Sequence, residues 1–150
     1  MAASKTGIKR IAIGVDGSES SAAAIKWAIR LAKGMGSQVF AIYAVDMPVY
    51  FPERDELPFV LDQDWRAGMK SEFEDKWWRP LKVAGVRYRA VMEDGRAATV
   101  IAAVAERETA DVIVVGRRGR GGVAELLLGS TSHELVLHSR RPVLVVSAKA

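Results

Sequence analysis

The feature that most constrains this chain is the alternation of short apolar runs with segments of helical periodicity. The helical segments carry apolar residues at intervals of three and four, whereas the runs between them are rich in Val and Ile. This alternation predicts an α/β protein, a doubly wound five-stranded parallel sheet with helices on both faces. At 150 residues, the chain is expected to form a single domain, 1–150. The expected strands are 8–15, 39–45, 86–92, 112–115 and 142–146, and the expected helices are 20–33, 64–83, 95–108 and 130–139.

Two of these strands carry signals of their position in the sheet. The run 112–115 has no polar interruption, which is typical of a central parallel strand that is buried on both faces. In 86–92, Arg87 and Arg89 alternate with apolar residues, which predicts a half-exposed strand at a sheet edge.

The helical segments also have definable inner faces. In 20–33, Trp27 and Leu31 widen an apolar stripe, and Gly34 and Gly36 are expected to end the helix. In 64–83, large apolar residues at i and i+4 predict a core stripe, with a kink at Pro80. The expected inner residues are Ala22, Ile25, Ile29 and Ala32 in the first helix, Trp65, Met69, Phe73 and Trp77 in the second, and Ala98, Ile101, Val104 and Ala105 in the third.

Two segments lack regular patterning. Residues 1–8 are expected to form a flexible lead-in. Residues 46–63 combine Pro48, Pro52 and Pro58 with aromatic and charged residues, which predicts a long loop. Long loops in compact domains are often functional, so this one is interpreted as a lid, as a contact surface, or as a segment that packs over the sheet.

Composition excludes several classes of function. The 22 Lys and Arg against 18 Asp and Glu give a net charge of +4, too mild to require nucleic acid as a partner. The absence of cysteine excludes disulfides, thiolate metal sites and cysteine nucleophiles. The apolar runs are too short to span a membrane, and residues 1–9 lack the core of a signal peptide. A cytoplasmic location is therefore expected.

A glycine-rich stretch after the run 112–115 points to a phosphate site. Gly116 and Gly119 allow backbone to approach a ligand closely, and Arg117, Arg118 and Arg120 add positive charge. Gly129 then precedes a hydroxyl cluster at a helix start, where unpaired N–H groups and the helix dipole favour an anion. The cluster consists of Ser130, Thr131 and Ser132. The plainer alternative is a surface loop followed by an ordinary serine cap.

Other nucleotide motifs fit less well. A P-loop needs Gly-Lys-Ser or Gly-Lys-Thr after a strand, and the sequence has neither. Residues 119–124 match the dinucleotide pattern G-x-G-x-x-A, but no acidic residue follows Glu134, so NAD binding is rejected. In a doubly wound sheet, ligands bind where the strand order reverses, and we place this point between Asp16 and Gly116. Taken alone, Asp16 fits a structural turn before Ser18, which is expected to cap the following helix, whereas its place beside a phosphate site favours a ligand contact.

The spacing Gly116-x2-Gly119-x9-Gly129-Ser130, followed by the closing strand 142–146, resembles the signature of the universal stress protein family. The opening 11–18 is also similar to that family's first strand and turn, so the resemblance covers roughly residues 9–146. It implies the strand order 3-2-1-4-5 and a dimer. One branch of the family binds ATP tightly, and the branch without the glycine signature does not. The signature is present here, so the resemblance implies ATP binding.

The resemblance also implies roles for individual residues. Asp16 would meet the ribose or a phosphate-bound Mg or Mn ion, Ala44 would face the adenine, and Ser130 and its neighbours would hold the triphosphate. The full implied set is Gly14, Val15, Asp16, Ala44, Val115, Gly116, Arg118, Gly119, Gly129, Ser130, Thr131 and Ser132. No catalytic base is evident near the phosphates, so hydrolysis is expected to be slow or absent.

These observations favour an ATP-binding universal stress protein that acts as a nucleotide-dependent sensor. A slow ATPase and a partner-binding protein with a vestigial pocket are the alternatives. The strand 142–146 is apolar on both faces and is expected to join two copies in a homodimer. In a competing arrangement, residues 1–9 or 46–63 cover this edge.

Overall fold

The computed structural model describes residues 7–46, 63–118 and 128–149. Its core is a five-stranded, all-parallel sheet of order β3-β2-β1-β4-β5, which confirms the doubly wound fold and the expected strand order. The long loop and the lead-in fall mainly on 47–62 and 1–6, outside the described residues. The strands are β1 (Arg10–Gly14), β2 (Gln38–Val45), β3 (Tyr88–Asp94), β4 (Val112–Gly116) and β5 (Val143–Val146).

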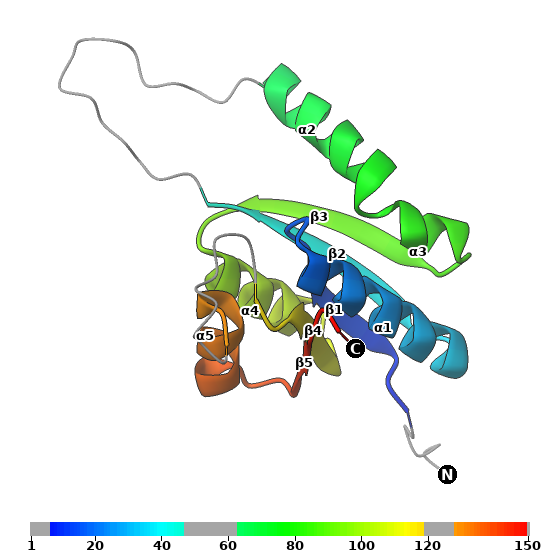
Figure 1. Cartoon of the computed structure of the whole chain (residues 1–150), viewed down its shortest axis with the longest axis vertical. Helices are drawn as coiled ribbons and strands as arrows, with labels where there is room; N and C mark the ends of the chain where they lie inside the picture. The colour runs from blue at the N-terminus through cyan, green and yellow to red at the C-terminus, as the bar shows by residue number, and fades with distance from the viewer. Residues whose placement is uncertain (1–6, 47–62, 119–127, 150) are drawn as a thin grey trace, which may run out of the picture.

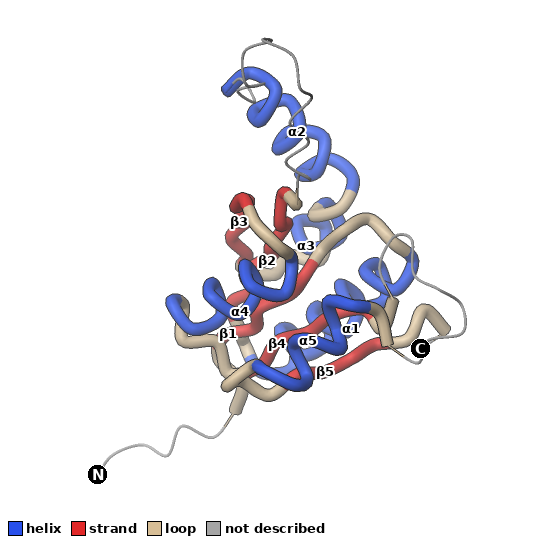
Figure 2. Tube along the Cα trace, turned by 90° about the vertical axis from the view of Figure 1, so that its left-hand side faces the viewer, coloured by secondary structure: helices blue, strands red, loops and turns tan. Residues whose placement is uncertain are grey.

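Helices cover both faces of this sheet (Figure 1). On one face lie α1 (Glu19–Met35), α2 (Gln63–Lys76) and α3 (Arg79–Val83), and on the other lie α4 (Ala97–Arg107) and α5 (Ser130–His138). Figure 2 shows α2 extending beyond the compact part formed by the sheet and the other helices. None of the helices in the described ranges combines the length and the apolar character that a membrane span needs.

Two apolar clusters hold the layers together. The first joins α1, α2 and α3 to the sheet and contains the fully buried Trp78 and Leu81. The second joins α4 and α5 to the opposite face through residues such as Ile101, Val104 and Leu135. The four inner residues expected in α4 are all buried, as the helical periodicity predicted.

Helix α1 begins as expected but differs along its length. Ser18 caps it, because its hydroxyl accepts a hydrogen bond from the N–H of Ser21 at 3.1 Å. Gly36 ends it in the left-handed conformation, with φ of 66°. Gly34 was predicted to help end the helix, but it lies within the exposed last turn of α1.

The inner face of α1 agrees with the prediction only in part, because Ile25 and Ala32 are buried as expected but the other two residues are not. Ala22 is exposed and Ile29 is half-buried, whereas Ser20, Ala24 and Ala28 are buried. Small side chains therefore face the sheet, and they allow α1 to approach it closely.

The expected helix 64–83 is two helices. The helix is interrupted at Trp77 and Trp78. Pro80 lies in the first turn of α3, where N–H groups form no hydrogen bond within the helix, so the missing N–H of proline costs nothing. Pro80 therefore helps to start a helix and does not kink one. The side chain of Phe73 is buried and stacks on Trp77, whereas the side chain of Trp65 lies outside the described residues.

Candidate functional site at the carboxyl ends of β1 and β4

The strand order reverses between β1 and β4, which are hydrogen-bonded neighbours in the centre of the sheet. Their carboxyl ends lead into Asp16 and Arg117, so the two segments singled out from the sequence meet at one edge. This edge is where ligands bind in doubly wound sheets, because the chain leaves adjacent strands toward opposite faces and opens a crevice between them.

Asp16 is held in a compact turn that leads into α1. One of its carboxylate oxygens accepts a hydrogen bond from the N–H of Ser18 at 2.9 Å, and its own N–H donates to the hydroxyl of Ser21 at 3.1 Å. The structural turn considered from the sequence is therefore present. The turn fixes the position of the Asp16 carboxylate at the switch point.

Gly116 and Gly14 are both places of close packing. A β-carbon on Gly116 would meet the carbonyl carbon and β-carbon of Ser20 at 2.6 Å. A β-carbon on Gly14 would meet the side chain of Ile101 at 2.7 Å and that of Val115 at 3.1 Å. Both glycines therefore bring helices close to the ends of β1 and β4, and their need for small size is explained by the fold itself.

The peptide groups of Arg117 connect the end of β4 to the start of α5. The carbonyl oxygen of Arg117 accepts hydrogen bonds from the N–H of Gly129 at 2.7 Å and from the hydroxyl of Ser132 at 2.8 Å. The N–H of Arg117 donates to the carbonyl oxygen of Val146 at 2.7 Å. The two halves of the glycine signature are therefore adjacent in space, although residues 119–127 between them lie outside the described residues.

The first turn of α5 presents main-chain donors at this edge. Gly129 occupies the cap position in an extended conformation, and within the described part of the chain no side chain caps the helix. The N–H of His133 closes the first helical bond onto Gly129, so the amides of Ser130, Thr131 and Ser132 precede the first regular helical donor. An anion is the partner that such a helix start favours.

The three hydroxyls of the cluster lie in different environments. Ser130 is exposed, Thr131 is half-buried, and Ser132 is 1% exposed. The Ser132 hydroxyl already donates within the protein, to the carbonyl oxygens of Arg117 and Gly129. Only its main-chain N–H is therefore available as a donor, whereas Ser130 can offer both groups.

The remaining predicted residues surround this edge or lie outside the description. Val15 and Val115 are buried, and Ala44 is half-buried at the end of β2. Arg118 is half-buried, and its Nε atom is buried without a hydrogen-bond partner among the described residues. Gly119 and Arg120 lie outside the described residues.

The described residues do not assemble a protein metal centre. Among them, no group of three His, Asp or Glu side chains is arranged to hold a metal ion. Asp16 would supply a single carboxylate, so an ion here would need most of its oxygen ligands from a bound phosphate, as Mg²⁺ commonly does. His133 and His138 are both exposed on α5.

The sequence could not have indicated the role of Arg117. Its side chain suggested a phosphate contact, but its main chain forms the junction between β4, β5 and α5. Nothing in a residue type reveals such a backbone role. The neighbouring Gly116 and the serine at the start of α5 were the available signals.

Comparison with known proteins places this arrangement in a family. The sequence profile described as the universal stress protein family matches residues 7–147. A universal stress protein of Methanocaldococcus jannaschii is 35% identical over 141 residues, which cover 92% of this chain and 81% of that protein.

Solved structures share the fold. The universal stress protein UspA from Lactobacillus plantarum superposes with a TM-score of 0.77 at 21% identity, over 95% of this chain and 99% of that one. A universal stress protein solved in complex with cAMP superposes with a TM-score of 0.69 at 24% identity, over 95% of this chain and 99% of that one. A universal stress protein family protein from Arabidopsis thaliana with AMP bound superposes with a TM-score of 0.64 at 17% identity, over 93% of this chain and 91% of that one. The profile match over nearly the whole chain and the 35% identity together show that this chain belongs to the universal stress protein family.

Proposed function

We propose that this chain is an ATP-binding module that acts as a nucleotide-dependent sensor or signalling protein. The observation that carries the proposal is the junction at Arg117, which sets the first turn of α5, capped by no side chain of the described residues, beside the end of β4. Main-chain donors, the positive end of a helix and arginine side chains gather there, and this is the chemistry that binds phosphates.

The rest of the proposed site follows the same edge of the sheet. The adenine would lie near Val15 and Ala44, the ribose near Asp16 and Gly116, and the phosphates near Gly129 and the amides that follow it. Two proteins with this fold were solved with the adenine nucleotides cAMP and AMP, which supports a nucleotide of that class as the ligand. Arg118, together with Gly119 outside the described residues, completes the proposed set.

A divalent Mg or Mn ion fits this proposal as a companion of the phosphates. The ion would neutralise part of the triphosphate charge, and the Asp16 carboxylate would hold it on the protein side. The amides of α5 would orient the phosphates whether or not the ion is present. We propose no catalytic residue, and turnover of ATP is expected to be slow or absent.

Mass spectrometry of the purified protein for retained nucleotide is the first test. Calorimetry with ATP, AMP and adenosine then measures the phosphate contribution directly, and the affinity is expected to fall in that order. Equal affinities for the three ligands, or no binding of any, would rule out the proposed phosphate site. Rapid steady-state release of phosphate would favour an ATPase.

We also propose that two copies pair through β5. This strand is at the edge of the sheet, and Val143, Leu144 and Val145 are only half-buried in one chain. Val136 and Leu137 on the adjoining helix α5 are 50% and 61% exposed. An apolar edge strand is usually covered, and a second β5 across a two-fold axis would pair its open backbone groups.

A further inference from the structure

A second feature lies on the α1 side of the sheet and shares Arg118 with the proposed nucleotide site. It is a cavity of about 360 Å³, bounded by the first turn of α1, the residues after β4 and the residues after β5. The lining comes from residues 18–20, 117–118 and 147–149. The first turn of α5, which is central to the nucleotide proposal, packs on the other face of the sheet.

The lining of this cavity carries an excess of positive charge. Arg117, Arg118 and Lys149 line it together with one carboxylate, that of Glu19. Among the described residues, none of the three cations forms an ion pair, whereas Arg89, Arg107 and Arg141 each pair with a glutamate. The buried Nε of Arg118 also has no hydrogen-bond partner among the described residues. A buried donor of this kind is normally satisfied by an acceptor, which a bound anion would supply.

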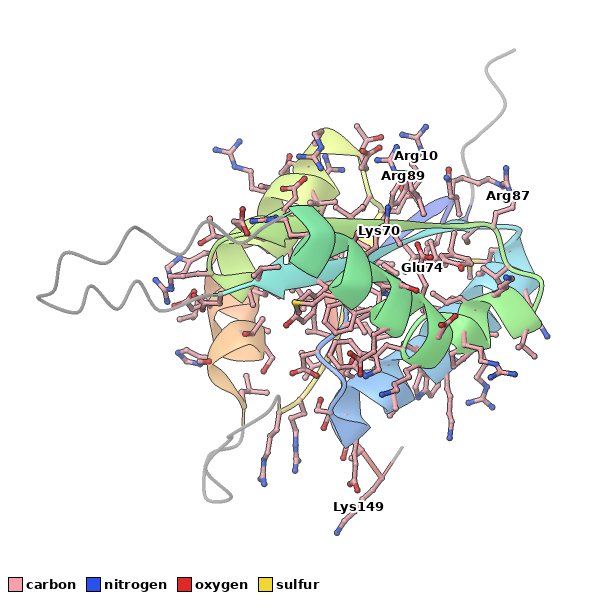
Figure 3. All side chains as sticks on the ribbon, turned by 90° about the horizontal axis from the view of Figure 1, so that it is seen from above. Arg10, Lys70, Glu74, Arg87, Arg89 and Lys149 are labelled. Atoms are coloured by element: carbon pink, nitrogen blue, oxygen red, sulfur yellow. The ribbon has the colours of Figure 1, made fainter. Side chains whose placement is uncertain are left out.

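The position of Lys149 separates this cluster from Arg10, Arg87 and Arg89. In Figure 3, Lys149 lies on the opposite side of the molecule from Arg10, Arg87 and Arg89. Arg87 and Arg89 belong to the region of β3, and Arg10 begins β1, so those cations lie at the amino ends of the strands. The cavity cations instead follow β4 and β5 at the carboxyl ends.

Hydroxyl and main-chain groups complete the lining. Ser20 and Ser147 contribute hydroxyls beside the cations, and the amide of Glu19 belongs to the first turn of α1, where helical N–H groups lack partners within the helix. The Ser18 hydroxyl is already used to cap the helix. Such a lining suits an anion that carries hydroxyl groups, since the Glu19 carboxylate accepts hydrogen bonds from hydroxyls.

We propose that this cavity binds a small phosphorylated molecule with hydroxyl groups, of the sugar-phosphate class. Its phosphate would contact Arg117, Arg118 and Lys149, and its hydroxyls would face Ser20 and Glu19. The cavity is larger than an inorganic phosphate needs, so the ligand is expected to extend beyond the phosphate. The site is separate from the proposed nucleotide site, although Arg118 borders both.

The test uses ribose 5-phosphate, inorganic phosphate and ribose as probes on the full chain. Calorimetry measures their affinities for the parent protein and for Arg117→Ala, Lys149→Ala and Lys82→Ala. The last variant removes an exposed cation on α3, away from the cavity, and is the matched control. Each cavity variant is expected to bind ribose 5-phosphate about threefold to tenfold more weakly than the parent, because a hydrogen bond to a charged group is lost.

Amide NMR shifts during the same titration locate the bound probe. Shifts centred on Glu19, Ser20 and Lys149, with ribose 5-phosphate tighter than inorganic phosphate and ribose inactive, would support the proposal. Shifts centred on Ser130 and Thr131 would overturn it while leaving the nucleotide proposal intact. Equal loss of affinity in Lys82→Ala, or no binding at millimolar concentration, would also overturn it. Lys149→Ala is expected to leave ATP binding unchanged, so failure of one proposal is distinguishable from failure of the other.

Discussion

Gly116 has no space for a side chain, because the carbonyl carbon of Ser20 lies 2.6 Å from the position that a β-carbon would occupy. The obstacle is helix backbone, which cannot rotate away as a side chain can. Gly116→Ala is therefore expected to destabilise the fold by about 1–3 kcal/mol, as overpacking of a core does. Chemical denaturation monitored by circular dichroism measures the loss.

Gly34→Ala is the matched control for this prediction. Gly34 lies inside α1 with nothing within 4 Å of an added β-carbon. Alanine favours helix over glycine, so this variant is expected to be more stable by about 0.5–1 kcal/mol. Equal effects of the two substitutions would contradict the close contact between β4 and α1.

Ser130→Glu is expected to weaken ATP binding without weakening the fold. The new carboxylate would lie in the first turn of α5, where it interacts favourably with the helix dipole but repels phosphates. The affinity for ATP should fall by about tenfold or more, since like charges at a binding site cost several kcal/mol. Calorimetry measures the affinity, and thermal unfolding measures the stability.

Ser71→Glu provides the same chemical change on the exposed side of α2. This variant should bind ATP as the parent does. Loss of ATP binding in both variants would indicate a general effect of charge and would count against the site at α5.

Leu144→Lys is expected to shift the proposed homodimer toward the monomer. The substitution puts a charge in the middle of β5, at an edge that is apolar in the parent. The dimer dissociation constant should rise by at least about tenfold, as for a central residue of an interface. Arg89→Lys at the opposite edge strand should leave the association unchanged. Sedimentation velocity at micromolar concentration decides this, and a monomeric parent would refute the proposed dimer.

Acid should weaken the attachment of the segment before β5 to α4. Arg141 donates a hydrogen bond to Glu106 at 3.0 Å, and this bond, with the positive charges of Arg141 and Arg140, holds the pKa of Glu106 below its ordinary value. A carboxyl whose pKa is lowered by folding stabilises the native state above its unfolded pKa and loses that contribution as pH falls through the folded pKa.

Stability measured between pH 6 and about pH 3 should therefore fall less steeply in Glu106→Gln than in the parent. The pair is exposed, so the difference is expected to be small. Glu72→Gln is the comparison variant. The hydrogen bond from Lys76 in the same helix also lowers the pKa of Glu72, so its pH profile should change in the same way. An unchanged pH profile in Glu106→Gln would show that the Arg141 contact contributes no stability.

Periodicity was sufficient to predict most of the architecture. The apolar run 112–115 predicted a central strand, and the alternation around Arg87 and Arg89 predicted an edge strand, and both positions are confirmed. These predictions succeeded because burial on one or two faces is recorded in the sequence at fixed spacing. The fold class followed from the same local patterns, whereas the family was indicated by the spacing of the glycine signature.

The errors arose where tertiary contacts outweigh local patterns. The aromatic spacing runs through Trp77, so it does not indicate that a helix ends there and another begins at Arg79. The burial of Ser20 against Gly116 is a tertiary contact that no spacing within α1 reveals. Sequence likewise cannot show that the Ser132 hydroxyl is already bonded to Arg117.

The main-chain hydrogen bonds on both sides of Arg117 couple the start of α5 to β5. Its N–H is bonded to the last residue of the edge strand β5, and its carbonyl oxygen is bonded to the residue that starts α5. The two peptide units that flank the α-carbon of Arg117 therefore connect the start of α5 to the edge of the sheet. A ligand that displaced the start of α5 would lengthen the 2.7 Å hydrogen bond to Arg117 or shift β5 with it. A displacement caused by a bound phosphate at the start of α5 would thus be transmitted to β5, the strand through which a second copy is proposed to bind.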